Sequence, residues 1–173
     1  MKWQSGRGGG NIEDRRGMSG GRKLTVGGIG GVIVLLIGFL MGGDPSQLLN
    51  QIQQGDGAAV NEQGEYVSTP EEDQLMSFSD KVLVSTDEVW TKIFADAGKS
   101  YPKPTLVVYT GGTETGGCGA GHASYGAFYC PGDNKLYMDL SFNKELQGKY
   151  GAKGEFALAY VIAHEVGHHI QNL

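Results

Sequence analysis

Near its C-terminus the chain carries two histidines and a glutamate in the order His164-Glu165-Val166-Gly167-His168. On a helix, residues four apart lie one turn apart on one face, so both imidazoles could bind one tetrahedral Zn²⁺. Glu165 is turned by about 100° from His164 around such a helix, which places its carboxylate beside the metal rather than on it. There it could take a proton from zinc-activated water as a general base. The motif therefore predicts hydrolysis of a peptide bond.

Two histidines do not complete a catalytic zinc site, which usually has three protein ligands and one open position. The chain ends five residues after His168, which leaves no room for the longer pattern HExxHxxGxxH. We expect the third ligand to be a carboxylate on a helix beyond Leu173, rather than His122 in a Gly-rich loop. The chain by itself is then expected to bind zinc weakly and to have little or no activity. His169 points away from His168, so we expect it to be solvated or to support the site without binding the metal.

The motif needs a helix to hold it, and the sequence predicts one from about Gly154 to the chain end. Phe156, Tyr160, Ala163 and Ile170 lie along one side of it. Upstream, Thr69 and the following Pro-Glu-Glu begin an amphipathic helix over about 70–97, which Gly98 can end. Further signals predict strands at 105–109 and 135–140, a short helix over 141–147, and a long Gly-rich loop over 110–127.

The charge of the chain is unevenly distributed. The net charge is −5, which argues against a nucleic-acid-binding protein. Residues 1–23 carry a net charge of +4 and the remainder −9. Between them, residues 24–43 hold no charged side chain and would span about 30 Å as a helix. We therefore predict a single transmembrane helix with a cytoplasmic N-terminus; a cleaved signal peptide and a buried helix are the alternatives.

This reading divides the chain into four parts. A basic, Gly-rich cytoplasmic tail over 1–23 is expected to be disordered, and the transmembrane helix follows over 24–43. A flexible stalk over 44–69 then leads to a folded domain over 70–173, placed in the periplasm or outside the cell. The 30 glycines of the chain also argue against one compact domain from end to end. Small-xxx-small pairs in the transmembrane segment either provide a face for a homo-oligomer or arise by chance.

The two cysteines, Cys118 and Cys130, are twelve positions apart. Outside the cytoplasm such a pair favours a disulfide, which would close a loop worth about 3 kcal/mol of chain entropy. A metal-binding pair together with His122 and two free thiols are the alternatives.

Several segments together resemble the bacterial "putative neutral zinc metallopeptidase" family. They are the opening MKWQSGRGGGNIEDRRGMSGG, the apolar segment, DEVWTKIFADAGKSYPKPTLVVY, the block CG…FYCPGDNKLYMDLSF and AYVIAHEVGHHIQNL. The resemblance covers nearly all of the chain except the stalk. It implies a membrane-anchored peptidase with a zincin-like catalytic domain, with His164 and His168 as zinc ligands and Glu165 as the catalytic acid and base. It also implies a further acidic ligand on a helix after the motif.

We therefore predict an α+β protein in which a single transmembrane helix precedes a partial zincin-like metallopeptidase domain. Its expected function is hydrolysis of peptide or protein substrates at the bacterial inner or plasma membrane, with Zn²⁺ as the cofactor. By analogy with zincins, the strand at 135–140 is our candidate for an edge strand that pairs with an extended substrate. The alternative is a membrane-tethered, non-catalytic module that binds zinc and interacts with a partner.

Overall fold

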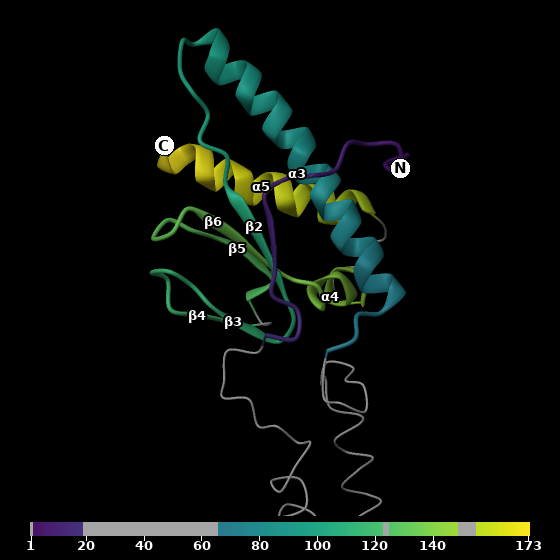
Figure 1. Ribbon diagram of the computed structural model, residues 1–173. Helices are drawn as coiled ribbons and strands as arrows, with labels where there is room; N and C mark the ends of the chain where they lie inside the picture. The colour runs from purple at the N-terminus through teal and green to yellow at the C-terminus, as the bar shows by residue number, and fades with distance from the viewer. Residues whose placement is uncertain (1, 19–65, 123–124, 149–154) are drawn as a thin grey trace, which may run out of the picture. The chain divides into compact units, whose positions relative to one another are not determined.

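The structure is a computed structural model that describes residues 2–18, 66–122, 125–148 and 155–173 (Figure 1). All helices and strands in these ranges belong to one unit of the chain, formed by Met1–Gly20 and Pro70–Leu173. The predicted transmembrane helix over 24–43 and most of the predicted stalk lie outside the described residues.

Four strands form a mixed sheet at the centre of this unit. In spatial order they are β1 (Ile12–Asp14), β2 (Thr105–Tyr109), β6 (Lys135–Asp139) and β5 (Ala127–Cys130). The first three run parallel, and β5 is antiparallel to β6. The strands at 105–109 and 135–140 are thus confirmed, and β2 and β6 are buried on both faces, as expected for central strands.

The N-terminal segment is part of the fold. Strand β1 pairs with β2, and the carboxylate of Asp80 accepts hydrogen bonds from the amides of Gly9 (2.8 Å) and Gly10 (2.7 Å). Trp3 packs edge-on against Phe78, with ring centroids 5.3 Å apart. Residues 2–18 therefore differ from the disordered tail that the sequence predicts, because specific backbone and aromatic contacts offset the entropic cost of ordering their glycines.

The long helix α3 (Pro70–Asp96) matches the predicted one. It ends as the sequence indicates, because Gly98 adopts a left-handed conformation with φ of 70°. The amide of Lys99 then donates to the carbonyl of Phe94 (2.8 Å), and that of Gly98 to Ala95 (2.9 Å). This pair of bonds is the Schellman pattern that satisfies the last carbonyls of a helix.

Three helices, α3, α4 (Phe142–Gly148) and α5 (Glu155–Asn172), cover one face of the sheet (Figure 1). Alternate residues of the two central strands, such as Leu106 and Met138, pack there against Leu83 of α3 and Ile162 of α5, and all four side chains are 1% exposed or less. This layer forms the main hydrophobic core and fixes α5, which carries the HExxH motif, against the sheet.

The opposite face of the sheet is covered by a hairpin of β3 (Gly112–Glu114) and β4 (Ala120–His122). Gly121 of β4 packs directly on the ring of Phe128, where an added Cβ would lie 3.0 Å from a ring carbon. The long loop predicted over 110–127 is therefore wrong in part. The strands of the hairpin are only three residues long and Gly-rich, so they lack the alternating apolar pattern that identifies strands.

The prediction of a membrane-anchored protein is not supported and has to be corrected. Across the described ranges, the structure contains no helix with both the length and the apolar character needed to cross a membrane. The two long helices, α3 and α5, are amphipathic and carry acidic residues or the polar motif within their spans. The membrane location, and the transmembrane element of the predicted fold class, rested on the uncharged residues 24–43, the basic residues before them and the family resemblance.

Candidate metal centre

The HExxH motif lies in the second half of α5, and its residues are divided between two faces of the helix. Glu165 and His169 lie on the buried face that packs on the sheet, whereas His164 and His168 are exposed. The side predicted from Phe156 and Tyr160 is not the packed one, since these residues are 73% and 64% exposed. The buried face of α5 instead mixes apolar and polar residues: Leu158, Ile162, Glu165, Val166 and His169.

The two exposed histidines point toward one another. Their Nε2 atoms lie 3.0 Å apart, and their ring centroids 4.6 Å apart. The Nδ1 atom of His168 lies 3.1 Å from Oε1 of Gln171, an amide oxygen that can only accept a hydrogen bond. Nδ1 of His168 therefore carries the hydrogen, which leaves its Nε2 with a free lone pair directed at His164. Two imidazole nitrogens in this arrangement suit a shared Zn²⁺, because both can lie about 2 Å from one ion.

Glu165 lies between this pair and the sheet and is 8% exposed. Burial raises the pKa of its carboxyl group, while the nearby His168 and His164 and a backbone hydrogen bond from Tyr129 act in the opposite direction. The carboxylate is thus placed beside the histidine pair rather than within it, as the motif predicts. It is also held against strand β5, which the sequence does not predict.

A cavity of about 560 Å³ opens beside the motif, between α5 and β5. Its walls include Phe128, Tyr129 and Pro131 on one side and Glu165, His168 and Gln171 on the other. Strand β5 forms the edge of the sheet here, whereas β6 lies between β2 and β5. The sequence-based choice of 135–140 as the edge strand is therefore wrong, because strand order depends on contacts that no local pattern encodes.

His169 is 1% exposed and is not solvated. Its Nε2 lies 2.7 Å from the carbonyl oxygen of Pro102, and its Nδ1 3.3 Å from the hydroxyl of Tyr129. The rings of Tyr129 and Tyr101 flank the imidazole at centroid distances of 5.5 Å and 5.9 Å. Of the two roles expected for His169, the structure therefore favours the one in which it supports the site without binding the metal.

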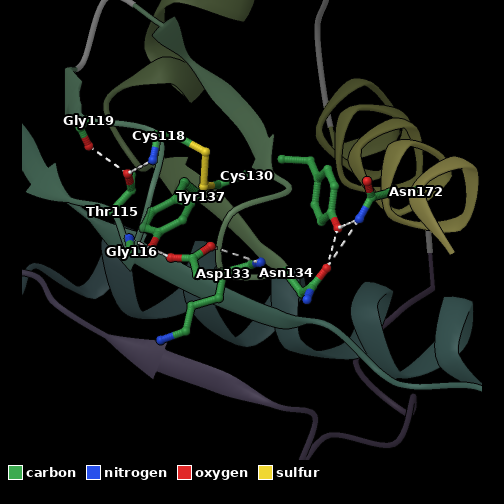
Figure 2. Close-up of a disulfide and its surroundings, with 11 residues drawn as sticks. Thr115, Gly116, Cys118, Gly119, Cys130, Asp133, Asn134, Tyr137 and Asn172 are labelled. Carbon is green, nitrogen blue, oxygen red and sulfur yellow. Dashed lines mark hydrogen bonds between the residues drawn. A yellow bond between two sulfur atoms is a disulfide. The ribbon is translucent and has the colours of Figure 1, made fainter.

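The remaining candidate residues lie in and around the β3–β4 hairpin. Cys118 and Cys130 form a disulfide, as predicted, and it ties the loop before β4 to the end of β5 (Figure 2). His122 is the last residue of β4, and the structure does not describe its side chain. Among the side chains that the structure describes, no cluster of three or more His, Cys, Asp or Glu residues could hold a metal ion.

Sequence reasoning missed two residues of this region. Gln171 had a local signal, since it follows His168 by three positions on the same helix and can reach its ring. Tyr129 had none, because it is 36 positions away from Glu165 and meets α5 only through the pairing of β5 with β6.

Comparisons with known proteins agree with the motif. The family model described as "Putative neutral zinc metallopeptidase" matches residues 1–173. The chain is 42% identical over 180 residues to "Uncharacterized protein YpfJ" of Escherichia coli strain K12, an alignment that covers 100% of this chain and 61% of the relative. It is 40% identical over 90 residues to "Uncharacterized protein Rv2575" of Mycobacterium tuberculosis, covering 51% of this chain and 29% of the relative.

No solved structure matches the chain. The chain spans about 61% of the length of the Escherichia coli relative. The family supports a peptidase function in general and implies Zn²⁺ as the cofactor. With a family model that matches the whole chain and a relative aligned over all of it, the chain belongs to the family described as "Putative neutral zinc metallopeptidase".

Proposed function

We propose that the cavity between α5 and β5 is a site of peptide-bond hydrolysis, with His164 and His168 as two zinc ligands, Glu165 as the general base and a third ligand that is not among the described residues. The observation that carries this proposal is the 3.0 Å approach of the two Nε2 atoms beside a buried carboxylate. Bound there, Zn²⁺ would polarise the peptide carbonyl and lower the pKa of water.

The residues around the histidine pair prepare it for a metal. Gln171 accepts the Nδ1 hydrogen of His168 and so keeps Nε2 unprotonated and correctly turned. Both histidines are exposed, so an ion can reach them from solution. Glu165 lies on the neighbouring face of the same helix, and its carboxylate lines the cavity, where it can accept a proton from water.

Strand β5 supports a role for the cavity in binding an extended peptide. It is the edge strand of the sheet nearest to α5, and an edge strand presents backbone donors and acceptors to a further strand. A substrate that added to this edge would bring its backbone alongside Glu165. The proposed substrate class is therefore a peptide or an unfolded protein segment in extended conformation.

Metal-dependent hydrolysis by the purified protein tests the proposal. Metal-free protein should gain up to one weakly bound Zn²⁺ per chain, and a mixture of fluorescence-quenched peptides should be cleaved slowly, and only after zinc is restored. Replacement His164→Ala should abolish both zinc binding and cleavage, whereas Glu88→Gln on the exposed side of α3 should change neither. Zinc bound through the histidines without any cleavage would instead favour the non-catalytic zinc-binding module.

A further inference from the structure

The contacts of Tyr129 suggest a role that the HExxH motif does not contain. Tyr129 lies on β5, at the edge of the sheet, and lines the cavity. It lines that cavity together with Glu165, and its hydroxyl lies within reach of His169. Glu165 and His169 are one turn apart on the buried face of α5. A single residue of the edge strand therefore contacts two successive turns of the helix that carries the motif.

The hydrogen bonds around His169 define its tautomer. The carbonyl of Pro102, 2.7 Å from Nε2, can only accept, so Nε2 carries the hydrogen. Nδ1 is also buried, because the imidazole is 1% exposed. The hydroxyl of Tyr129, 3.3 Å away, is the polar group that the described structure places beside it.

The hydroxyl of Tyr129 donates its hydrogen to Oδ1 of Asn134 at 2.8 Å. Asn134 has another donor, because Nδ2 of Asn172 lies 3.4 Å from its Oδ1 and 3.2 Å from the tyrosine oxygen (Figure 2). The hydroxyl of Tyr129 therefore joins Asn134, Asn172 and His169 in one polar group between β5 and α5.

We propose that Tyr129, acting through His169 and Glu165, is a positioning residue that fixes the rotation of α5 against the edge strand β5. The inference rests on the proposed function. His164 and His168 share one helix, so their mutual spacing does not depend on Tyr129. What depends on it is the direction in which the histidine pair and Glu165 face the edge of β5, where the peptide would lie.

This distinction makes the role testable with Tyr129→Phe, which removes the hydroxyl and keeps the ring. Zinc affinity should stay within about threefold of the parent, while kcat should fall by about tenfold or more with KM little changed, since small misplacements are costly in catalysis. His169→Leu should behave in the same way. His169→Gln should recover part of the loss, because a glutamine amide can still donate to the carbonyl of Pro102. Tyr125→Phe, at an exposed tyrosine, is the matched control and should match the parent.

Two readouts do not require activity. In a long-range ¹H–¹⁵N spectrum, the Nδ1 resonance of His169 should move in Tyr129→Phe, because the hydroxyl beside it is lost. The amides of α5 around His169 should also exchange faster with deuterium in that variant, because the helix is held less firmly against β5. If both change but the parent cleaves no peptide, the positioning role stands and the proposed function fails. If neither changes, or if zinc affinity falls in parallel with kcat, the inference is wrong.

Discussion

The ammonium of Lys135 on β6 lies 2.7 Å from the carboxylate of Glu13 on β1, although β2 separates the two strands. Arg15 bonds the other oxygen of the same carboxylate at 2.7 Å. Arg15 also reaches the hairpin, where it donates to the carbonyl of Glu114 at 2.8 Å. The N-terminal segment is therefore tied by charge both to the central sheet and to the hairpin that covers its far face.

This contact predicts a pH-dependent stability. Hydrogen bonds from Arg15 and then Lys135 lower the pKa of Glu13, so its contribution is present at neutral pH and is lost as the pH falls through that lowered value. Because the Glu13 side chain is 40% exposed, Glu13→Gln should cost no more than about 1 kcal/mol at pH 7. Urea unfolding should show this difference shrinking between pH 5 and pH 3. The control is Glu88→Gln, which removes an exposed ion pair with Arg7. An equal loss of stability in that variant would argue against a specific role for Glu13.

The disulfide should contribute strongly to stability. It joins residues with a sequence separation of 12 and closes a loop from the turn of the hairpin through β4 to the end of β5, for which chain entropy predicts about 3 kcal/mol. The double variant Cys118→Ala, Cys130→Ala should lose about that amount in denaturant unfolding, and a reductant should destabilise the parent but not the variant. Peptide mapping under non-reducing conditions should show the two cysteine peptides joined. Two free thiols in protein purified under oxidising conditions would contradict the assignment.

Gln171 should affect zinc binding without being a ligand. It holds the Nδ1 hydrogen of His168, and partners of this kind typically contribute 10- to 100-fold in metal affinity. Because Gln171 is exposed, we expect Gln171→Ala to weaken zinc binding by about tenfold in a chelator competition. Gln171→Glu should keep the zinc affinity near that of the parent, since a carboxylate accepts the same hydrogen. Gln74→Ala, an exposed glutamine on α3, should leave the affinity unchanged; an equal decrease there would remove the basis for this role.

Local patterns predicted the elements better than their arrangement. The helix ending at Gly98 and the strands around Val107 and Tyr137 follow from capping and β-branched or alternating patterns that are complete within a few residues. Strand β1 was missed because Ile12–Asp14 is short and charged, and it becomes a strand only by pairing with β2. The family resemblance, unlike the membrane anchor, was confirmed by the comparisons.

The candidate site shows the same division. The spacing of His164 and His168 is a property of one helix, so their approach could be predicted from the sequence. The burial of His169 and its contact with Tyr129 could not be predicted in this way, because the two residues are 40 positions apart in the sequence. The apolar residues of α5 were also misleading, since Tyr160 is exposed while Glu165 is buried. Polar residues on a packed face are recognisable only once their partners are known.

The central claim is that Glu165 acts as the base beside a metal held by the two histidines. The most direct measurement is the rate of peptide cleavage per bound zinc in Glu165→Gln, compared with the parent and with Glu88→Gln. The amide cannot accept a proton, so the variant should keep its zinc and lose turnover by about 100-fold or more, the range expected for loss of a general base. A Glu165→Gln protein that cleaved peptides as fast as its parent at equal zinc content would contradict the account.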